Sequence, residues 1–199
     1  MSDFTYQTNN APVETYEWDN TWLDHADDGE TPRVLYIGDS ISCNCRRVAT
    51  ELAEGKLLFD GFGTSKALDN PFLKDSIRLF GSQQGTRKAV LFNNGLHGWH
   101  LEDETDYRQF YEQTVEFLLS EFAGTPLYIV LTTHVSDKAR NARVEARNRV
   151  AAEIAAQYDL PVIDLYAVSL TAKEYLRDGV HYHTEGNRLL ARAIVDALK

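Results

Sequence analysis

The chain has 199 residues, 43% of them hydrophobic and 25% charged, which suits one soluble globular domain with a sizeable core. Its formal net charge of −10 argues against nucleic acid or an anionic membrane as a partner, because phosphate groups are bound largely through Lys and Arg. Residues 1–20 resemble no signal peptide and no apolar run could cross a membrane, so we expect a cytoplasmic protein that acts on a neutral small molecule.

Residues 1–30 lie outside the regular pattern that follows and are interpreted as an N-terminal arm to a domain at 31–199. The arm carries Tyr16, Trp18 and Trp22, so we expect it to pack on the body or on a second copy in a homo-oligomer. Cys43 and Cys45 are too close in sequence for a disulfide with each other, and reduced thiols are expected.

From residue 33 onward, short apolar runs alternate with amphipathic stretches. This alternation predicts a three-layer α/β/α fold with a mainly parallel five-stranded sheet and helices on both faces. Ligands of such sheets bind at the carboxyl ends of the strands. Thr184 is expected to cap the last helix. The predicted strands are 33–37, 56–59, 88–92, 127–131 and 161–164, and the predicted helices follow residue 40 and cover 71–80, 103–122, 142–158 and 184–198.

Two short motifs have the residue types of a serine nucleophile and its base. Gly38-Asp39-Ser40-Ile41 follows the first strand and opens a helix, where the Ser40 N–H could stabilise an oxyanion. Asp178-Gly-Val-His181 precedes the last helix, and an aspartate there could hold the imidazole that accepts the serine proton. Each motif alone is better explained by a helix cap or a solvated loop.

Together, the two motifs resemble the first and last conserved blocks of the SGNH (GDSL-type) hydrolases. The similarity extends through Leu35–Ser42 and Asp178–Leu190 and covers about residues 33–198. It implies a flavodoxin-like SGNH fold and a serine esterase with Ser40, Asp178 and His181 as catalytic triad, without a metal or cofactor. By resemblance the substrates are short acyl esters, first of all O-acetylated carbohydrates. A thioesterase, a lysophospholipase-like enzyme, an acyltransferase and a binding protein with weakened catalysis are the alternatives.

The two middle blocks of that family are expected to complete an oxyanion hole with the Ser40 amide. The glycine of the second block is best matched by Gly63, with Gly61 as the alternative. In the third block, His97 stands where the family has an asparagine, and one imidazole N–H could replace the amide donor. Asn93 or Asn94 could supply the donor instead, or could cap the local backbone.

Three residues beside this third block are the expected substrate-binding residues: Trp99, His100 and Asn94. Trp99 could stack on a sugar or line an acyl pocket, or could simply pack in the core. His134 follows the fourth strand and is interpreted as a loop histidine. The basic residues of 138–149, including Arg143 and Arg147, are interpreted as a solvated helix face.

Overall fold

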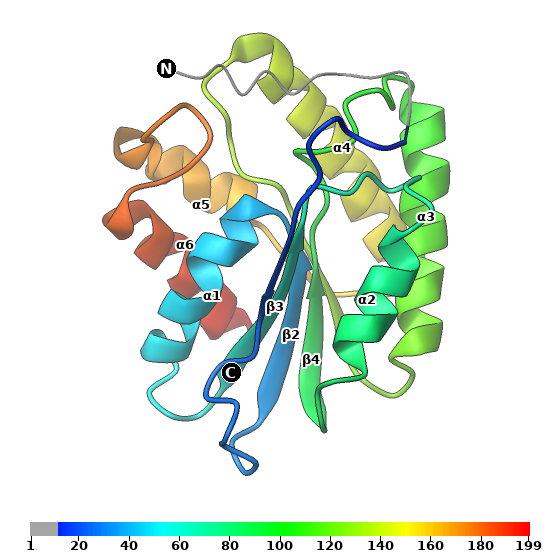
Figure 1. Ribbon diagram of the computed structural model, residues 1–199. Helices are drawn as coiled ribbons and strands as arrows, with labels where there is room; N and C mark the ends of the chain where they lie inside the picture. Colours follow the sequence, from blue (N-terminus) through cyan, green and yellow to red (C-terminus); the bar gives the residue numbers. More distant parts are fainter. Residues whose placement is uncertain (1–11) are drawn as a thin grey trace.

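The computed structural model describes residues 12–199, which form a six-stranded sheet between two layers of helices (Figure 1). The strands are β1 (Asp19–Trp22), β2 (Arg33–Gly38), β3 (Leu58–Thr64), β4 (Arg87–Phe92), β5 (Leu127–Val130) and β6 (Val162–Ile163). The helices are α1 (Ser40–Leu52), α2 (Leu73–Gly81), α3 (Glu104–Glu121), α4 (Lys138–Gln157), α5 (Leu165–Thr171) and α6 (Thr184–Ala197), with a 3₁₀ turn, η1, at Lys173–Tyr175.

The strand order is β1-β3-β2-β4-β5-β6, and β2 to β6 are all parallel, which confirms the predicted sheet. β1, which brings the number of strands to six, was not predicted. β1 belongs to the N-terminal arm and pairs antiparallel with β3 along the edge of the sheet. All four of its residues are exposed, so no apolar alternation marks it, and its pairing with β3 alone makes it a strand.

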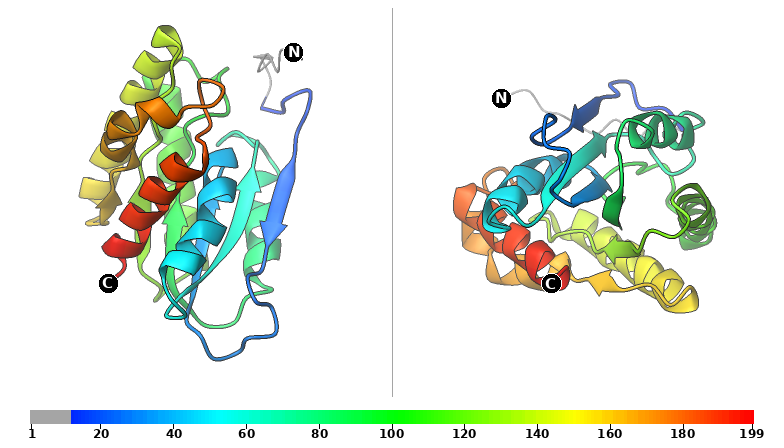
Figure 2. Two further views of the ribbon diagram at one scale, coloured as in Figure 1. Left: turned by 90° about the vertical axis from the view of Figure 1, so that its left-hand side faces the viewer. Right: turned by 90° about the horizontal axis from the view of Figure 1, so that it is seen from below.

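The two faces of the sheet carry separate hydrophobic cores, as the alternation of side chains along a strand requires. Val34 and Tyr36 of β2 lie in the core that α1, α5 and α6 cover, whereas Leu35 and Ile37 lie in the core under α2, α3 and α4. Figure 2 shows these two helical layers from the side and from below. None of the helices within residues 12–199 is long and apolar enough to cross a membrane.

β3 and α6 begin or end differently from the prediction. β3 continues to Thr64 through Gly61 and Gly63, which were expected after the strand, because it pairs with β1 and β2 over this length. Its neighbours leave no room for a side chain at either glycine. A Cβ at Gly61 would lie 2.4 Å from the Arg46 side chain, and one at Gly63 would lie 2.2 Å from Cys43 Sγ. Thr184 is the first residue of α6 rather than its cap; His183 holds the cap position without a side-chain hydrogen bond.

Candidate active site

Ser40 lies at the carboxyl edge of the sheet, at the point where β2 ends and α1 begins. Asp39 caps α1, because its Oδ1 accepts a hydrogen bond from Ile41 N at 2.9 Å. Gly38 is required by the sharp turn, since a Cβ there would lie 2.8 Å from Cβ of Ser42. Ser40 is therefore the first residue of a 13-residue helix, with its N–H among the amides that carry the positive end of the helix dipole.

The Asp178–His181 turn is built by its own backbone. Asp178 Oδ1 accepts hydrogen bonds from Val180 N at 3.1 Å and from His181 N at 2.8 Å. Gly179 adopts a φ of +88°, which favours glycine, and a Cβ there would also lie 2.4 Å from Ser136 Oγ. The sequence Asp-Gly-x-His thus folds so that the carboxylate and the imidazole of one short turn meet.

The structure brings these two motifs together from opposite ends of the domain. His181 Nε2 lies 2.7 Å from Ser40 Oγ, and His181 Nδ1 lies 2.9 Å from Asp178 Oδ2. With a proton on Nδ1, held by the carboxylate, Nε2 is the acceptor that faces the serine hydroxyl. Ser40, His181 and Asp178 therefore form one chain of hydrogen bonds with the polarity that removes a proton from the serine.

The charge state of Asp178 suits this chain of hydrogen bonds. Partial burial would raise the pKa of its carboxyl, but the hydrogen bonds from the His181 backbone and ring and from Val180 N outweigh it and hold the pKa well below its usual range. The carboxylate stays ionised near neutral pH. About 45% of its side chain is exposed, against 21% for His181.

Asp39, which precedes Ser40, differs from Asp178 in its burial and in the direction of its pKa shift. It is fully buried, its Oδ2 has no hydrogen-bond partner among residues 12–199, and burial raises the pKa of its carboxyl while the proximity of His97 and His181 lowers it. We assign it the capping role only.

His97 lies on the loop between β4 and α3 and is 5% exposed. Its Nδ1 lies 3.2 Å from Oε1 of Glu14, and its ring packs edge-on against Trp18 with the centroids 5.9 Å apart. Both partners belong to the N-terminal arm, which therefore packs on the body of its own chain at the carboxyl edge. Nothing in the sequence near His97 indicates these contacts, since Glu14 is 83 residues away.

Gly63 lies between Gly38 of β2 and Asn20 of β1 in the sheet. Ser65 N donates to the Trp18 carbonyl at 3.1 Å, so Trp18 and Ser65 are a hydrogen-bonded pair of the β1–β3 ladder. Such pairs alternate with non-bonded ones along an antiparallel ladder, so the pair Asn20 and Gly63 is bonded again. This register directs the Gly63 N–H toward β1, and the part of Gly63 in an oxyanion hole stays a prediction.

The three expected substrate-binding residues are engaged within the protein. Trp99 is 6% exposed and lies against the guanidinium groups of Arg143 and Arg147, 4.9 and 4.7 Å from its ring centroid. His100 Nε2 lies 2.8 Å from Asp69 Oδ2, and Asn94 Nδ2 donates to the Lys66 carbonyl at 3.0 Å. Trp99 is therefore a packing aromatic rather than a sugar platform, and Asn94 ties two loops together. Asn93 likewise donates to the Val130 carbonyl at 2.8 Å.

Arg147 is the residue that sequence reasoning missed. It was interpreted as part of a solvated helix face, yet it is 4% exposed. Its two terminal nitrogens donate to four carbonyl oxygens of one loop, those of Gly95, His97, Gly98 and Leu101, at 2.7–3.3 Å. The guanidinium also lies 4.5 Å from the ring centroid of Tyr107. Arg147 therefore shapes the loop that carries His97.

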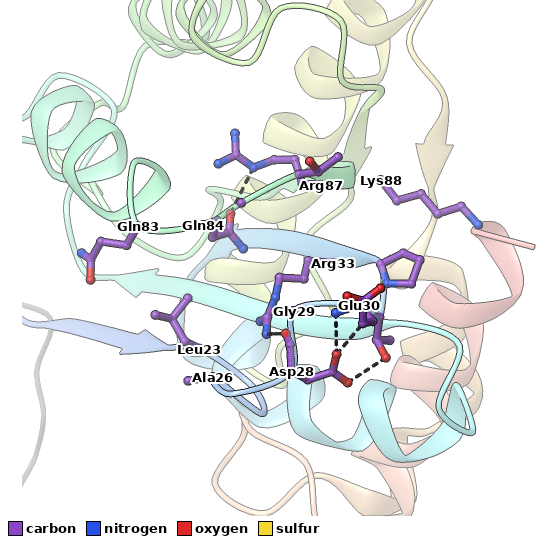
Figure 3. A pocket seen from close by; sticks show the side chains of 14 residues that line it. Leu23, Ala26, Asp28, Gly29, Glu30, Arg33, Gln83, Gln84, Arg87 and Lys88 are labelled. Atoms are coloured by element: carbon purple, nitrogen blue, oxygen red, sulfur yellow. Dashed lines mark hydrogen bonds between the residues drawn. The ribbon is translucent and has the colours of Figure 1, made fainter.

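A pocket of about 460 Å³ opens at the other end of the sheet, between residues 23–33 and 83–88 (Figure 3). Arg33 and Arg87 line it, but Arg33 donates to Asp60 Oδ1 at 2.8 Å and Arg87 donates to Gln84 Oε1 at 3.1 Å. The triad lies at the opposite, carboxyl edge. Within residues 12–199 no group of His, Cys, Asp or Glu side chains could hold a metal ion.

No protein-family model and no curated protein sequence matches the chain. Its fold, however, is shared by many solved structures. A member of the lipolytic G-D-S-L family from Veillonella parvula is 18% identical, with a TM-score of 0.66 over 83% of this chain and 97% of that one. A GDSL-like lipase from Parabacteroides merdae is 17% identical, with a TM-score of 0.67 over 84% and 96%. The acetylxylan esterase Axe2 from Geobacillus stearothermophilus is 13% identical, with a TM-score of 0.62 over 84% and 94%. With Ser40 after the first parallel strand and Asp178 and His181 before the last helix, this chain has the fold of the SGNH, or GDSL-type, hydrolases.

Proposed function

We propose that this protein is a serine carboxylic ester hydrolase that works through an acyl-enzyme. The observation that carries the proposal is the hydrogen-bonded chain from Ser40 Oγ through His181 to Asp178, at 2.7 and 2.9 Å. A serine hydroxyl is a weak nucleophile until a base accepts its proton, and an oriented imidazole is the base that this chain provides.

In the proposed reaction, His181 Nε2 accepts the Ser40 proton while Oγ attacks the ester carbonyl. The protonated imidazole is stabilised by the Asp178 carboxylate and then gives its proton to the leaving alcohol. Water, activated by the same imidazole, next attacks the acyl-enzyme, releases the acid and returns the proton to Ser40. No metal or organic cofactor takes part in these steps.

The oxyanion of the tetrahedral intermediate needs donors that are already in place. The Ser40 amide, in the first turn of α1, is the first of them. We further propose His97 as a side-chain donor, since it lies on the loop after the neighbouring strand β4. Because Nδ1 faces Glu14, this role requires a proton on Nε2. We also propose Gly63 as a third donor, which requires its N–H to turn from β1 toward the substrate.

For the substrate, we propose short acyl esters, with acetylated carbohydrates first. The support is indirect: two of the similar folds belong to proteins named as acetyl xylan esterases, and others are named lipases. The net charge of −10 also favours a neutral substrate over an anionic one.

The test is turnover of p-nitrophenyl acetate by the wild type and by Ser40→Ala, with a fluorophosphonate probe to label the reactive serine. We expect turnover and labelling in the wild type and neither in Ser40→Ala, although the variant stays folded. Equal turnover in both proteins would contradict the assignment. Acetyl, butyryl and octanoyl esters and acetylated oligosaccharides, compared on the same preparation, then identify the preferred acyl group and alcohol.

A further inference from the structure

The loop between β4 and α3 presents its backbone in an unusual orientation. On one side of the loop, Arg147 donates hydrogen bonds to the carbonyl oxygens of Gly95, His97, Gly98 and Leu101. In a trans peptide the N–H points away from the C=O of the same unit. The N–H groups of Gly98 and Trp99 are therefore directed to the opposite side, away from the guanidinium.

On that opposite side lies a carboxylate. Glu14 Oε1 is 3.2 Å from His97 Nδ1 and 3.5 Å from Gly98 N. Gly98 has a φ of +66°, a left-handed conformation that helps neighbouring amides to converge on an anion. The peptide between His97 and Gly98 is thus polarised from both ends, with a guanidinium at its oxygen and a carboxylate at its N–H.

The burial of Glu14 makes these contacts important for its carboxyl group. Its side chain is only 16% exposed, and within residues 12–199 it forms no ion pair with Lys or Arg. A carboxylate withdrawn from water needs compensation, which here comes from the imidazole and the amide. Glu14 is also held close by its own chain, since Glu17 Oε1 accepts from Glu14 N at 3.1 Å and from Asn70 Nδ2 at 2.7 Å.

We propose that His97 and the Gly98 amide form a carboxylate-binding site, that Glu14 is its built-in occupant, and that a small free carboxylate such as acetate binds there when the Glu14 side chain is removed. A tethered group competes as if it were present at roughly millimolar concentration or more, so weak free carboxylates are excluded while Glu14 is in place. Acetate would also be the acid released by an acetylesterase. If Glu14 excludes acetate from the site, it limits inhibition of the enzyme by its product, and this consequence rests on the proposed function. The binding of acetate to the site does not rest on it.

The experiment follows the histidine ring resonances by NMR during titration with sodium acetate, with sodium chloride at equal ionic strength as reference. It compares the wild type with Glu14→Ala, which removes the tethered carboxylate and empties the site. Glu30→Ala is the matched control, because it removes an exposed carboxylate of the arm at the other end of the sheet.

We expect the His97 resonances of Glu14→Ala to shift saturably with acetate, at a midpoint at least about tenfold lower than in the wild type. Glu30→Ala should behave like the wild type. The proposal is overturned if Glu14→Ala gives no saturable shift, if chloride produces the same shift, if only His181 responds, or if Glu30→Ala gains affinity equally. Because no turnover is needed, acetate binding in a protein without esterase activity would reject the proposed function and leave this inference intact.

Discussion

The Asp178–His181 turn and the loop from Gly95 to Leu101 both lie at the carboxyl edge of the sheet, but they are held in different ways. The turn is stabilised by hydrogen bonds that span two or three residues, and the Asp178 side chain is nearly half exposed. The loop is buried and is held by Arg147 on one side and Glu14 on the other. The acid–base pair is thus preassembled by its own segment, whereas the geometry around His97 depends on distant parts of the chain.

Removing the imidazole of the turn should have the largest effect. Within residues 12–199, His181 is the side chain that forms a hydrogen bond with Ser40 Oγ. His181→Ala removes this base, so we expect esterase turnover to fall by roughly 10⁴–10⁶-fold. Thermal unfolding should change little. Near-wild-type turnover would mean that the turn is not the source of the base.

Asp178→Asn tests whether the turn orients the base as well as supplying it. The amide can donate to His181 Nδ1 and so favours the wrong tautomer, and we expect kcat to fall by roughly 10³–10⁴-fold, less than for His181→Ala. Kinetics of the variant against the wild type provide the measurement. Unchanged kcat would assign the orientation of His181 to another group.

His97 tests the loop in the same assay. As an oxyanion donor it acts mainly in the transition state, so His97→Ala should lower kcat by roughly 10²–10³-fold with less change in KM. His97→Asn should restore part of the loss, because an amide is a similar donor on a shorter side chain. An intact kcat in His97→Ala would restrict the ring to packing against Trp18 and binding Glu14.

Arg147 tests whether the loop depends on the body of the protein. Arg147→Met leaves buried carbonyl oxygens without a donor, so we expect the free energy of unfolding to fall by about 2–4 kcal/mol in urea denaturation. Arg149→Met is the control two residues along α4, where an exposed pair with Glu104 at 3.3 Å should contribute no more than about 0.5 kcal/mol. Equal effects of the two substitutions would show that the loop does not need Arg147.

The smallest expected effect is the pH dependence of the turn. Because the pKa of Asp178 is lower in the folded protein, its ionised carboxylate adds stability above the unfolded pKa of about 3.9, and this contribution is lost as pH falls through the folded pKa. The difference in unfolding free energy between the wild type and Asp178→Asn should be constant at about pH 5–7 and shrink below about pH 4. A difference that grows on acidification would contradict the assigned direction.

The same contrast explains what could be predicted from the sequence. The parallel strands and the two end motifs are local patterns: an apolar run, a serine directly after it, and an aspartate three residues before a histidine. β1 escaped prediction because its residues are exposed and only its partner strand orders it. Arg147 has the spacing of a solvated helix residue, and only the folded loop shows its buried role. Contacts such as that of Glu14 with His97 have no local signal at all.

The direction of α6 has a practical consequence for handling the protein. The helix begins at Thr184, three residues after His181, and its 14 residues extend about 21 Å away from the carboxyl edge (Figure 2). An affinity tag, a fluorophore or a solid support attached after Lys199 would therefore be anchored on the far side of the molecule from Ser40. The arm, by contrast, brings Glu14 against His97. Carboxyl-terminal attachment is thus the orientation that would leave the triad facing a bulky or polymeric ester.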